Sequence, residues 1–300
     1  MDRVAIFIFW MLHWLPQPVL AMLGRSFGKL AFFLARERRD VALVNLKSCM
    51  PELDEDEVYK LAQRHFMALG RMATEWTVLW WGSEKRLRRM VRIVNLDRLL
   101  AYKGVPVILL APHFVGLDMC GVRLSMEMTL CTMYTQQKNR RFTELFLKGR
   151  MRFNSGNRPF SRQEGIRPLL RALKENIPAY FLPDQDAGRE GAVFVPFFGQ
   201  TAATLTSLPR LARAANAVVI PAIPRQVENG YVLEIGEPWK NYPGEDVKED
   251  TFRMNLYIES VVRTMPEQYF WVHKRFKTQT DPSRQFYEEA IVALRAEKQS

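Results

Sequence analysis

The chain has 300 residues, 48% of them hydrophobic, and a formal net charge of +11. Its length and hydrophobic content allow one large domain with a sizeable core, and the excess of Lys and Arg predicts acidic partners such as nucleic acid, anionic lipid or an acidic protein. The three cysteines, Cys49, Cys120 and Cys131, form no CxxC pattern, which argues against a disulfide framework or a zinc site.

The first element, residues 4–23, is apolar except for His13 and Gln17. About 20 such residues are just enough to cross a bilayer, but the prolines at positions 16 and 18 should break a helix there. Basic residues follow, which places the next segment on the cytoplasmic side of a membrane. We therefore expect residues 1–40 to be a membrane anchor with a basic flank, which either spans the bilayer or lies in its interface, and residues 41–300 to be the main domain. A buried pair of core helices is the alternative.

The next element is a long helix that ends near Trp81. Asp54 and Glu57 have the spacing of a capping box at its start. The tryptophans at its end suit a membrane interface, and a well-packed core would use them equally well.

From residue 105 onward, apolar runs alternate with helical segments, which predicts an α/β fold: a mixed, mostly parallel central sheet flanked by helices. The expected strands are 105–111, 130–134, 179–182, 218–223 and 231–235. The expected helices are 117–128, 141–152, 162–175, 204–216 (with Thr204 as its cap) and 248–265.

His113 follows the first of these strands, and Asp118 comes five residues later. The two side chains can meet if His113 lies in a loop and Asp118 in the first turn of the next helix, a bend for which Pro112 and Gly116 are suited. Asp118 would then hold one imidazole nitrogen while the other accepts a proton, as in a general base. A structural histidine that caps a helix is an equally good interpretation of the pair alone.

Further polar residues follow other predicted strands and helices. Arginines in these positions suggest an anionic substrate, perhaps a phosphate. Asp184 and Asp186 could bind a divalent cation, but two carboxylates rarely suffice, so we expect them to structure a loop and predict no metal. The candidates for substrate binding are Lys138, Arg150, Arg152, Asp184, Asp186 and Gly188.

Several common motifs are missing from the sequence. It has no G-x-S-x-G elbow, no G-x-G-x-x-G loop and no cysteine next to a histidine. Covalent catalysis therefore has no evident nucleophile.

Taken together, these segments resemble the lipid A biosynthesis acyltransferases of Gram-negative bacteria (the late lauroyl and myristoyl transferases), within the broader H-x4-D/E acyltransferase group. The resemblance covers nearly the whole chain. It rests on the apolar N-terminus, on His113-Phe114-x-x-x-Asp118, and on several further blocks: Gly149-Arg150-x-Arg152, Pro183-Asp184-x-Asp186-x-Gly188, Val193–Phe198, Pro221-x-x-Pro224-Arg225 and Pro266–Lys277.

The resemblance implies a glycerolipid acyltransferase-like fold and a reaction without a cofactor. A fatty acyl chain would move from acyl-carrier protein, or as a second choice from coenzyme A, to a hydroxyl of a lipid A precursor. His113 would take the proton from that hydroxyl while Asp118 orients the ring, with direct attack and no acyl-enzyme. Arg150 and Arg152 would contact phosphate or the developing oxyanion, and Asp184, Asp186 and Gly188 would shape the site.

The same resemblance implies a location at the bacterial inner membrane, with the catalytic domain on the cytoplasmic side. Two other functions stay open at this point: acylation of a lysophospholipid or another glycolipid, and a non-catalytic, basic, peripheral membrane-binding protein. Nucleic-acid binding is disfavoured because the chain contains no recognised module and its basic residues are spread along the chain.

Overall fold

The computed structural model describes residues 2–136 and 139–297, and its main element is a seven-stranded sheet in the order β1-β9-β8-β2-β5-β3-β4. All neighbours in this sheet are parallel except β8 and β9, which form an antiparallel pair. The strands are β1 (Val91–Val94), β2 (Val107–Leu110), β3 (Cys131–Tyr134), β4 (Arg158–Ser161), β5 (Ala179–Phe181), β8 (Val218–Val227) and β9 (Gly230–Ile235). The predicted α/β fold with a mostly parallel sheet is confirmed.

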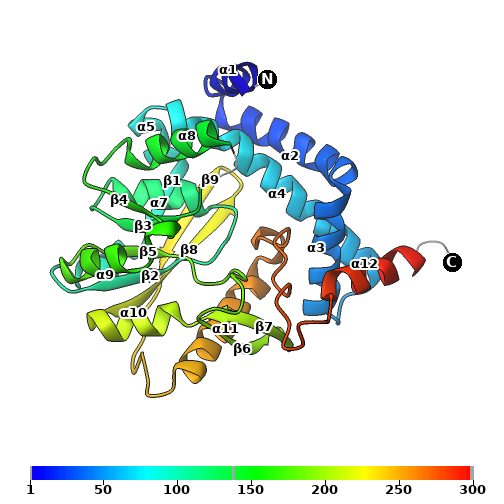
Figure 1. Ribbon diagram of the computed structural model, residues 1–300. Helices are drawn as coiled ribbons and strands as arrows, with labels where there is room; N and C mark the ends of the chain where they lie inside the picture. The colour runs from blue at the N-terminus through cyan, green and yellow to red at the C-terminus, as the bar shows by residue number, and fades with distance from the viewer. Residues whose placement is uncertain (1, 137–138, 298–300) are drawn as a thin grey trace.

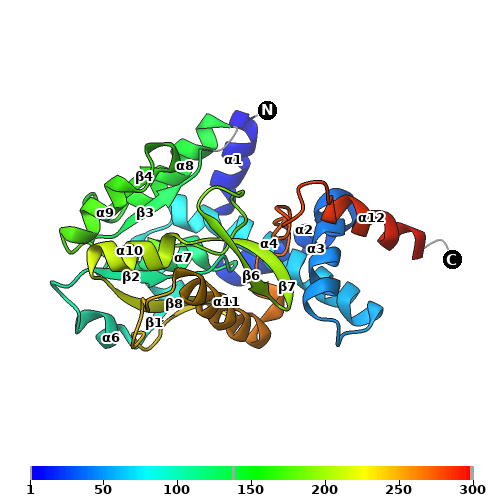
Figure 2. The same cartoon turned by 60° about the horizontal axis from the view of Figure 1, so that its bottom comes forward.

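Helices cover both faces of this sheet (Figures 1 and 2). Ile108 and Leu110 of β2 pack in one hydrophobic cluster with α9 and α10, while Val107 and Leu109 pack in the other cluster with α7. This alternation along β2 is the reason why the strand is a continuous apolar run. The helices are α1 (Asp2–Leu12), α2 (Gln17–Leu34), α3 (Arg36–Cys49), α4 (Glu55–Trp81), α5 (Glu84–Met90), α6 (Leu96–Leu100), α7 (Leu117–Ser125), α8 (Arg140–Met151), α9 (Arg167–Lys174), α10 (Ser207–Ala215), α11 (Val247–Thr264) and α12 (Phe286–Glu297).

The N-terminal helices form a layer beside the sheet (Figure 1). The proline break occurs as predicted, because α1 ends at Leu12 and α2 starts at Gln17. Within the described residues, no single helix is long and apolar enough to cross a membrane; only α2 and α3 together, bent by 92°, have the necessary length and composition. The boundary expected at residues 40 and 41 lies inside α3.

Close backbone contact joins α2 to α4. A Cβ atom on Gly24 would lie 2.4 Å from Oγ1 of Thr74, and one on Gly28 would lie 2.1 Å from the carbonyl oxygen of Phe66. Since any side chain larger than hydrogen would force the helices apart, this face of α2 is fixed against the domain. The capping box of α4 is present as predicted, with Asp54 and Glu57 each accepting from the other's backbone N–H.

Two element predictions were wrong. The helix expected over 162–175 is interrupted at Gly165, whose φ of +73° leaves only the segment Arg167–Lys174 as α-helix. Thr204 does not cap a helix, because it lies in β7 (Gln200–Leu205), which pairs with β6 (Ala192–Phe197) in a separate hairpin. The hairpin turns at Phe198 and Gly199, both with positive φ, as a tight two-residue turn requires.

Candidate active site

His113 lies just beyond the end of β2, and its ring is held by a buried carboxylate. Nδ1 of His113 is 2.7 Å from Oδ1 of Asp184, and the backbone N–H of His113 donates to Oδ2 of the same residue at 3.0 Å. Asp184 is 1% exposed, while the His113 side chain keeps 21% of its surface exposed. With Nδ1–H donating to Asp184, Nε2 is free to accept a proton.

The order of strands in the sheet brings this pair together. β2 and β5 are parallel neighbours, and the backbone N–H of Ala111, just past β2, donates to the carbonyl of Phe181, the last residue of β5. His113 and Asp184 therefore leave adjacent strands at the same edge of the sheet, the edge where ligands bind in α/β proteins. The two residues are 71 positions apart in the chain, so no local spacing could indicate their pairing.

Asp118 occupies the first turn of α7, as predicted, but it does not form the expected hydrogen bond with His113. Its Oδ1 accepts from Nη2 of Arg150 at 2.7 Å and from Nε at 3.2 Å. Arg150 reaches it from the last turn of α8. The orientation of the His113 ring by Asp118 is thus corrected: among the described residues, the carboxylate bonded to that ring is Asp184.

His113 lowers the pKa of the Asp184 carboxyl. Burial by itself raises the pKa of this carboxyl, but the positive charge of His113 and its two hydrogen bonds outweigh that effect and lower the pKa to about 2. Asp184 is therefore ionised at neutral pH and can stabilise a protonated imidazole. The nearby Tyr269 hydroxyl has its pKa raised well above the usual value by burial and by the Asp184 charge, so it stays neutral.

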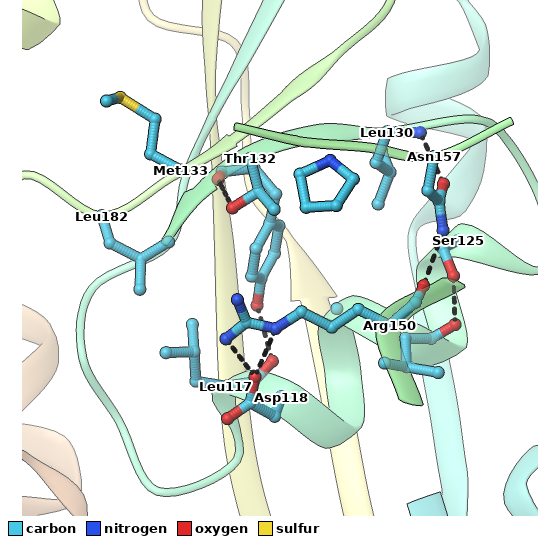
Figure 3. Close-up of a pocket in the computed structure, with 13 residues that line it drawn as sticks. Leu117, Asp118, Ser125, Leu130, Thr132, Met133, Arg150, Asn157 and Leu182 are labelled. Atoms are coloured by element: carbon cyan, nitrogen blue, oxygen red, sulfur yellow. Dashed lines mark hydrogen bonds and ion pairs between the residues drawn. The ribbon is translucent and has the colours of Figure 1, made fainter. Parts of the chain in front are cut away.

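A pocket of about 60 Å³ opens next to Asp118 and Arg150 (Figure 3). Figure 3 shows Arg150 stretched along the pocket with its guanidinium group on Asp118. Most of the other side chains that line it are apolar or small: Leu117, Gly121, Val122, Leu130, Met133, Pro159, Tyr180 and Leu182. Such a lining accepts a hydrocarbon chain, and the ion pair marks its polar end.

Arg152 has a different environment from Arg150, although it belongs to the same sequence block. Its guanidinium donates to the carbonyls of Leu79 and Trp81 at 3.4 and 3.2 Å and lies over the ring of Phe153. These contacts connect the end of α8 to the end of α4. Lys138, another predicted substrate-binding residue, lies outside the described residues.

Asp186 ties the loop after β5 to the C-terminal segment. Its carboxylate accepts from the backbone N–H and the hydroxyl of Thr278 at 2.7 and 2.8 Å, and from the backbone N–H of Gly188 at 2.9 Å. Gly188 has a φ of +96°, which a residue with a side chain rarely adopts. Both aspartates of this block thus bond to protein groups, and the described residues contain no group of three or more potential metal-ligating side chains.

The C-terminal segment runs alongside the His113 loop. The backbone N–H of Phe270 donates to the carbonyl of His113, and the N–H of Val115 donates to the carbonyl of Gln268, both at 3.0 Å. This short antiparallel contact fixes the backbone on which the imidazole is mounted. It also brings His273 into the neighbourhood of His113.

Comparisons with known proteins agree with this architecture. Residues 2–278 match the family model of the bacterial lipid A biosynthesis acyltransferases. The chain is 29% identical over 288 residues to a lipid A biosynthesis lauroyltransferase of Escherichia coli K12, with 94% of this chain and 93% of that protein covered. It is 30% identical to a palmitoleoyltransferase of the same pathway and organism, covering 90% and 89%.

A lipid A biosynthesis acyltransferase of Haemophilus influenzae is 33% identical over 262 residues, covering 85% of this chain and 81% of that protein. The match extends over the apolar N-terminus, the His113 loop, the pocket and most of the C-terminal segment. The chain belongs to the bacterial lipid A biosynthesis acyltransferases.

Proposed function

We propose that this protein transfers a fatty acyl chain from the thioester of an acyl-carrier protein to a hydroxyl of a lipid A precursor. The observation that supports the reaction most directly is the His113–Asp184 pair at 2.7 Å. His113 is only a few residues along the chain from Leu117 and Asp118, which line the apolar pocket. The family supplies the acceptor class, because the relatives are named for acylation in lipid A biosynthesis.

The proposed reaction needs one base and no covalent intermediate. Nε2 of His113 takes the proton from the acceptor hydroxyl while the Asp184 carboxylate stabilises the resulting imidazolium. The alkoxide attacks the thioester carbonyl and forms a C–O bond. The tetrahedral intermediate then collapses with cleavage of the C–S bond, and the leaving thiolate receives the proton from His113. None of the cysteines competes as a nucleophile, because Cys49, Cys120 and Cys131 are buried and burial raises the pKa of each thiol.

The pocket beside Asp118 accounts for the acyl chain in this proposal. Gly121 and Tyr180 lie against each other in the pocket wall, since a Cβ on Gly121 would lie 3.1 Å from the Tyr180 ring. The Asp118–Arg150 pair at the polar end would hold the guanidinium where a substrate phosphate arrives.

The net charge of +11 supports a carrier protein as the donor, since an acidic carrier would be drawn to this surface. Salt should weaken that attraction, because the Debye length falls from about 10 Å at 0.1 M to about 3 Å at 1 M.

We further propose that α1 and α2 lie in the surface of the bacterial inner membrane, with the sheet on the cytoplasmic side. The face of α2 opposite the glycines exposes large apolar side chains, among them Met22, Phe27 and Leu30, each more than half exposed. Trp14, in the turn after α1, is 70% exposed. Exposed Arg25 and Lys29 lie on the same helix and would meet anionic head groups.

The catalytic proposal is tested by incubating the purified protein with a tetra-acylated lipid A precursor and acyl-carrier proteins charged with chains of different length. A penta-acylated product supports it. Parallel reactions with acyl-coenzyme A and with a lysophospholipid acceptor separate the alternatives. Inactivity with every donor would remove the enzymatic interpretation.

The membrane proposal is tested with vesicles that contain phosphatidylglycerol. The double variant Phe27→Asp, Leu30→Asp should reduce cosedimentation at least tenfold, because two charges would enter the apolar layer. Val292→Asp is the matched control, since Val292 is 69% exposed on α12. Equal binding of the double variant and the control would contradict an interfacial α2.

A further inference from the structure

A second, smaller pocket lies on another side of His113. It is small, about 10 Å³, which is room for roughly one water-sized group, and its lining includes His113, Gln185, Tyr269, His273 and Arg275. The mechanism above uses only the first of these side chains as a reacting group. Two of the others, His273 and Arg275, have hydrogen-bond donors without an acceptor among the residues that the structure describes.

His273 is fixed in one tautomer by an unusual contact. Its Nε2 accepts the backbone N–H of Asp186 at 3.0 Å, so this nitrogen cannot carry a hydrogen. In the neutral ring the hydrogen must then be on Nδ1. That Nδ1–H has no hydrogen-bond partner among the residues that the structure describes.

The surroundings keep the His273 ring neutral and hold its backbone in place. Burial, and after it the positive charges of His113 and Arg275, lower the pKa of His273 to about 4. The backbone is held on both sides, because Asn45 donates to the carbonyl of His273 at 2.8 Å and the N–H of His273 donates to the carbonyl of Phe270 at 3.1 Å. A neutral ring with an occupied Nε2 is a donor only, so it cannot compete with His113 for the hydroxyl proton.

Arg275 adds a positive charge to the same pocket. It is 3% exposed and donates to the Ala203 carbonyl and the Thr204 hydroxyl, but its Nε has no acceptor in the described residues. The Nδ1–H of His273 and the Nε–H of Arg275 belong to side chains that line one small space beside His113, and an oxygen atom bound there could accept from them. In the proposed reaction, the oxygen that gains negative charge is the thioester carbonyl oxygen.

We propose that His273 is a catalytic hydrogen-bond donor, whose Nδ1–H binds the thioester carbonyl oxygen and stabilises the oxyanion formed when the alkoxide attacks. This assignment rests on the proposed acyl transfer. When the C–O bond forms, the π electrons of the carbonyl move to that oxygen, which accepts the hydrogen bond from His273. When the C–S bond breaks, the electrons return and the oxygen leaves the pocket with the ester.

The test compares three variants by steady-state kinetics with acyl-carrier protein thioesters and a tetra-acylated lipid A precursor. His273→Leu should lower kcat about 100-fold, the usual effect of removing one oxyanion donor, and change KM less than about threefold. His273→Gln, whose amide can both donate and accept, should have a kcat at least tenfold higher than that of His273→Leu.

Thr278→Val is the matched control for loop disturbance. It removes the Thr278 hydroxyl contact to Asp186 and leaves the His273 ring in place. It should keep kcat within about threefold of the wild type. If Thr278→Val lowers kcat as strongly as His273→Leu, or if His273→Leu keeps wild-type kcat, the assignment is overturned.

A second measurement does not depend on turnover. In nitrogen-15 NMR of the histidine-labelled protein, with His273→Leu to identify the signal, the His273 ring should be neutral at pH 6 with its hydrogen on Nδ1. A proton on Nε2, or a charged ring at that pH, would overturn the assignment even in an active enzyme. Inactivity of the wild type with all donors would instead refute the acyl-transfer proposal, and the two failures are thereby distinguished.

Discussion

Glu75 and Asp184 are buried carboxylates that each accept hydrogen bonds from a basic side chain, and they differ in whether that basic side chain keeps an atom free for a substrate. At the α4–β9 interface, Glu75 is 0% exposed and accepts from Arg71, Gln17 and Tyr231. At the edge of the sheet, Asp184 is equally buried but accepts from a histidine whose second ring nitrogen is free.

The α4–β9 cluster is saturated. Nε of Arg71 contacts both Glu75 oxygens at 3.0 and 3.1 Å, and its two terminal nitrogens donate to the carbonyls of Val227 and Gly230. Each nitrogen of the Arg71 guanidinium thus donates to a protein group, and the cluster joins α2, α4 and the β8–β9 hairpin. Burial and charge are alike in the two clusters. What separates a site that can react from a site that only stabilises is a side-chain atom left free to bind a substrate.

The strongest test of this contrast is removal of the proposed base. His113→Ala should lower kcat by about 10² to 10⁴-fold, the range for a general base, while the thermal unfolding midpoint changes little because the ring is partly exposed. Steady-state assays and thermal denaturation on the same preparation measure both effects. A folded His113→Ala protein with full activity would refute the role.

The second test removes the negative charge of Asp184, which contacts the His113 ring. Asp184→Asn should lower kcat about 100-fold or more, because the amide can stabilise the wrong tautomer and cannot stabilise an imidazolium. The pH profile of kcat should shift together with this loss. If Asp184→Asn keeps wild-type kcat, another group orients His113.

The third test applies the same change to the saturated cluster. Glu75→Gln leaves the Arg71 guanidinium buried without a counterion, so the free energy of unfolding should fall by about 3–5 kcal/mol, while kcat per folded molecule is retained. Urea denaturation measures the loss. The control is Glu84→Gln, in which the partner Arg88 belongs to an exposed i,i+4 pair and the loss should stay below about 0.5 kcal/mol.

The smallest expected effect is a pH dependence of stability that originates outside both clusters. His65 is fully buried, donates through Nδ1 to the carbonyl of Glu267 and leaves Nε2 without a partner; burial lowers its pKa to about 4. Below pH 6.5 the His65 ring is protonated in the unfolded chain, whereas in the folded chain it becomes protonated only near pH 4. Stability from this group is therefore complete above pH 6.5 and falls by about 2 kcal/mol between pH 7 and pH 5.

Urea denaturation at the two pH values, with His65→Asn as the comparison, measures this contribution. The asparagine amide can replace the Nδ1–H donor and does not titrate, so the variant should lose less stability than the wild type on acidification. An identical loss in both proteins would contradict the assignment to His65. The Asp184 carboxyl, with its pKa of about 2, contributes to acid unfolding only below about pH 4.

The sequence by itself determined the features that depend on local spacing. The α/β alternation, the break at Pro16, the capping box at Asp54 and the position of His113 at a strand end all follow from neighbouring residues, and each agrees with the structure. The family resemblance also came from linear motifs, and the match over residues 2–278 supports it. The interruption at Gly165 could not be predicted, because the helical pattern of residues before and after it continues across this position.

Only the tertiary structure decided which carboxylate meets His113. Asp118 is near in sequence, but α7 directs it to Arg150. Asp184 is 71 residues away, and the placement of β5 beside β2 brings it to the imidazole. Strand order depends on packing over the whole chain, so spacing along the sequence could point to His113 but not to the carboxylate that it contacts.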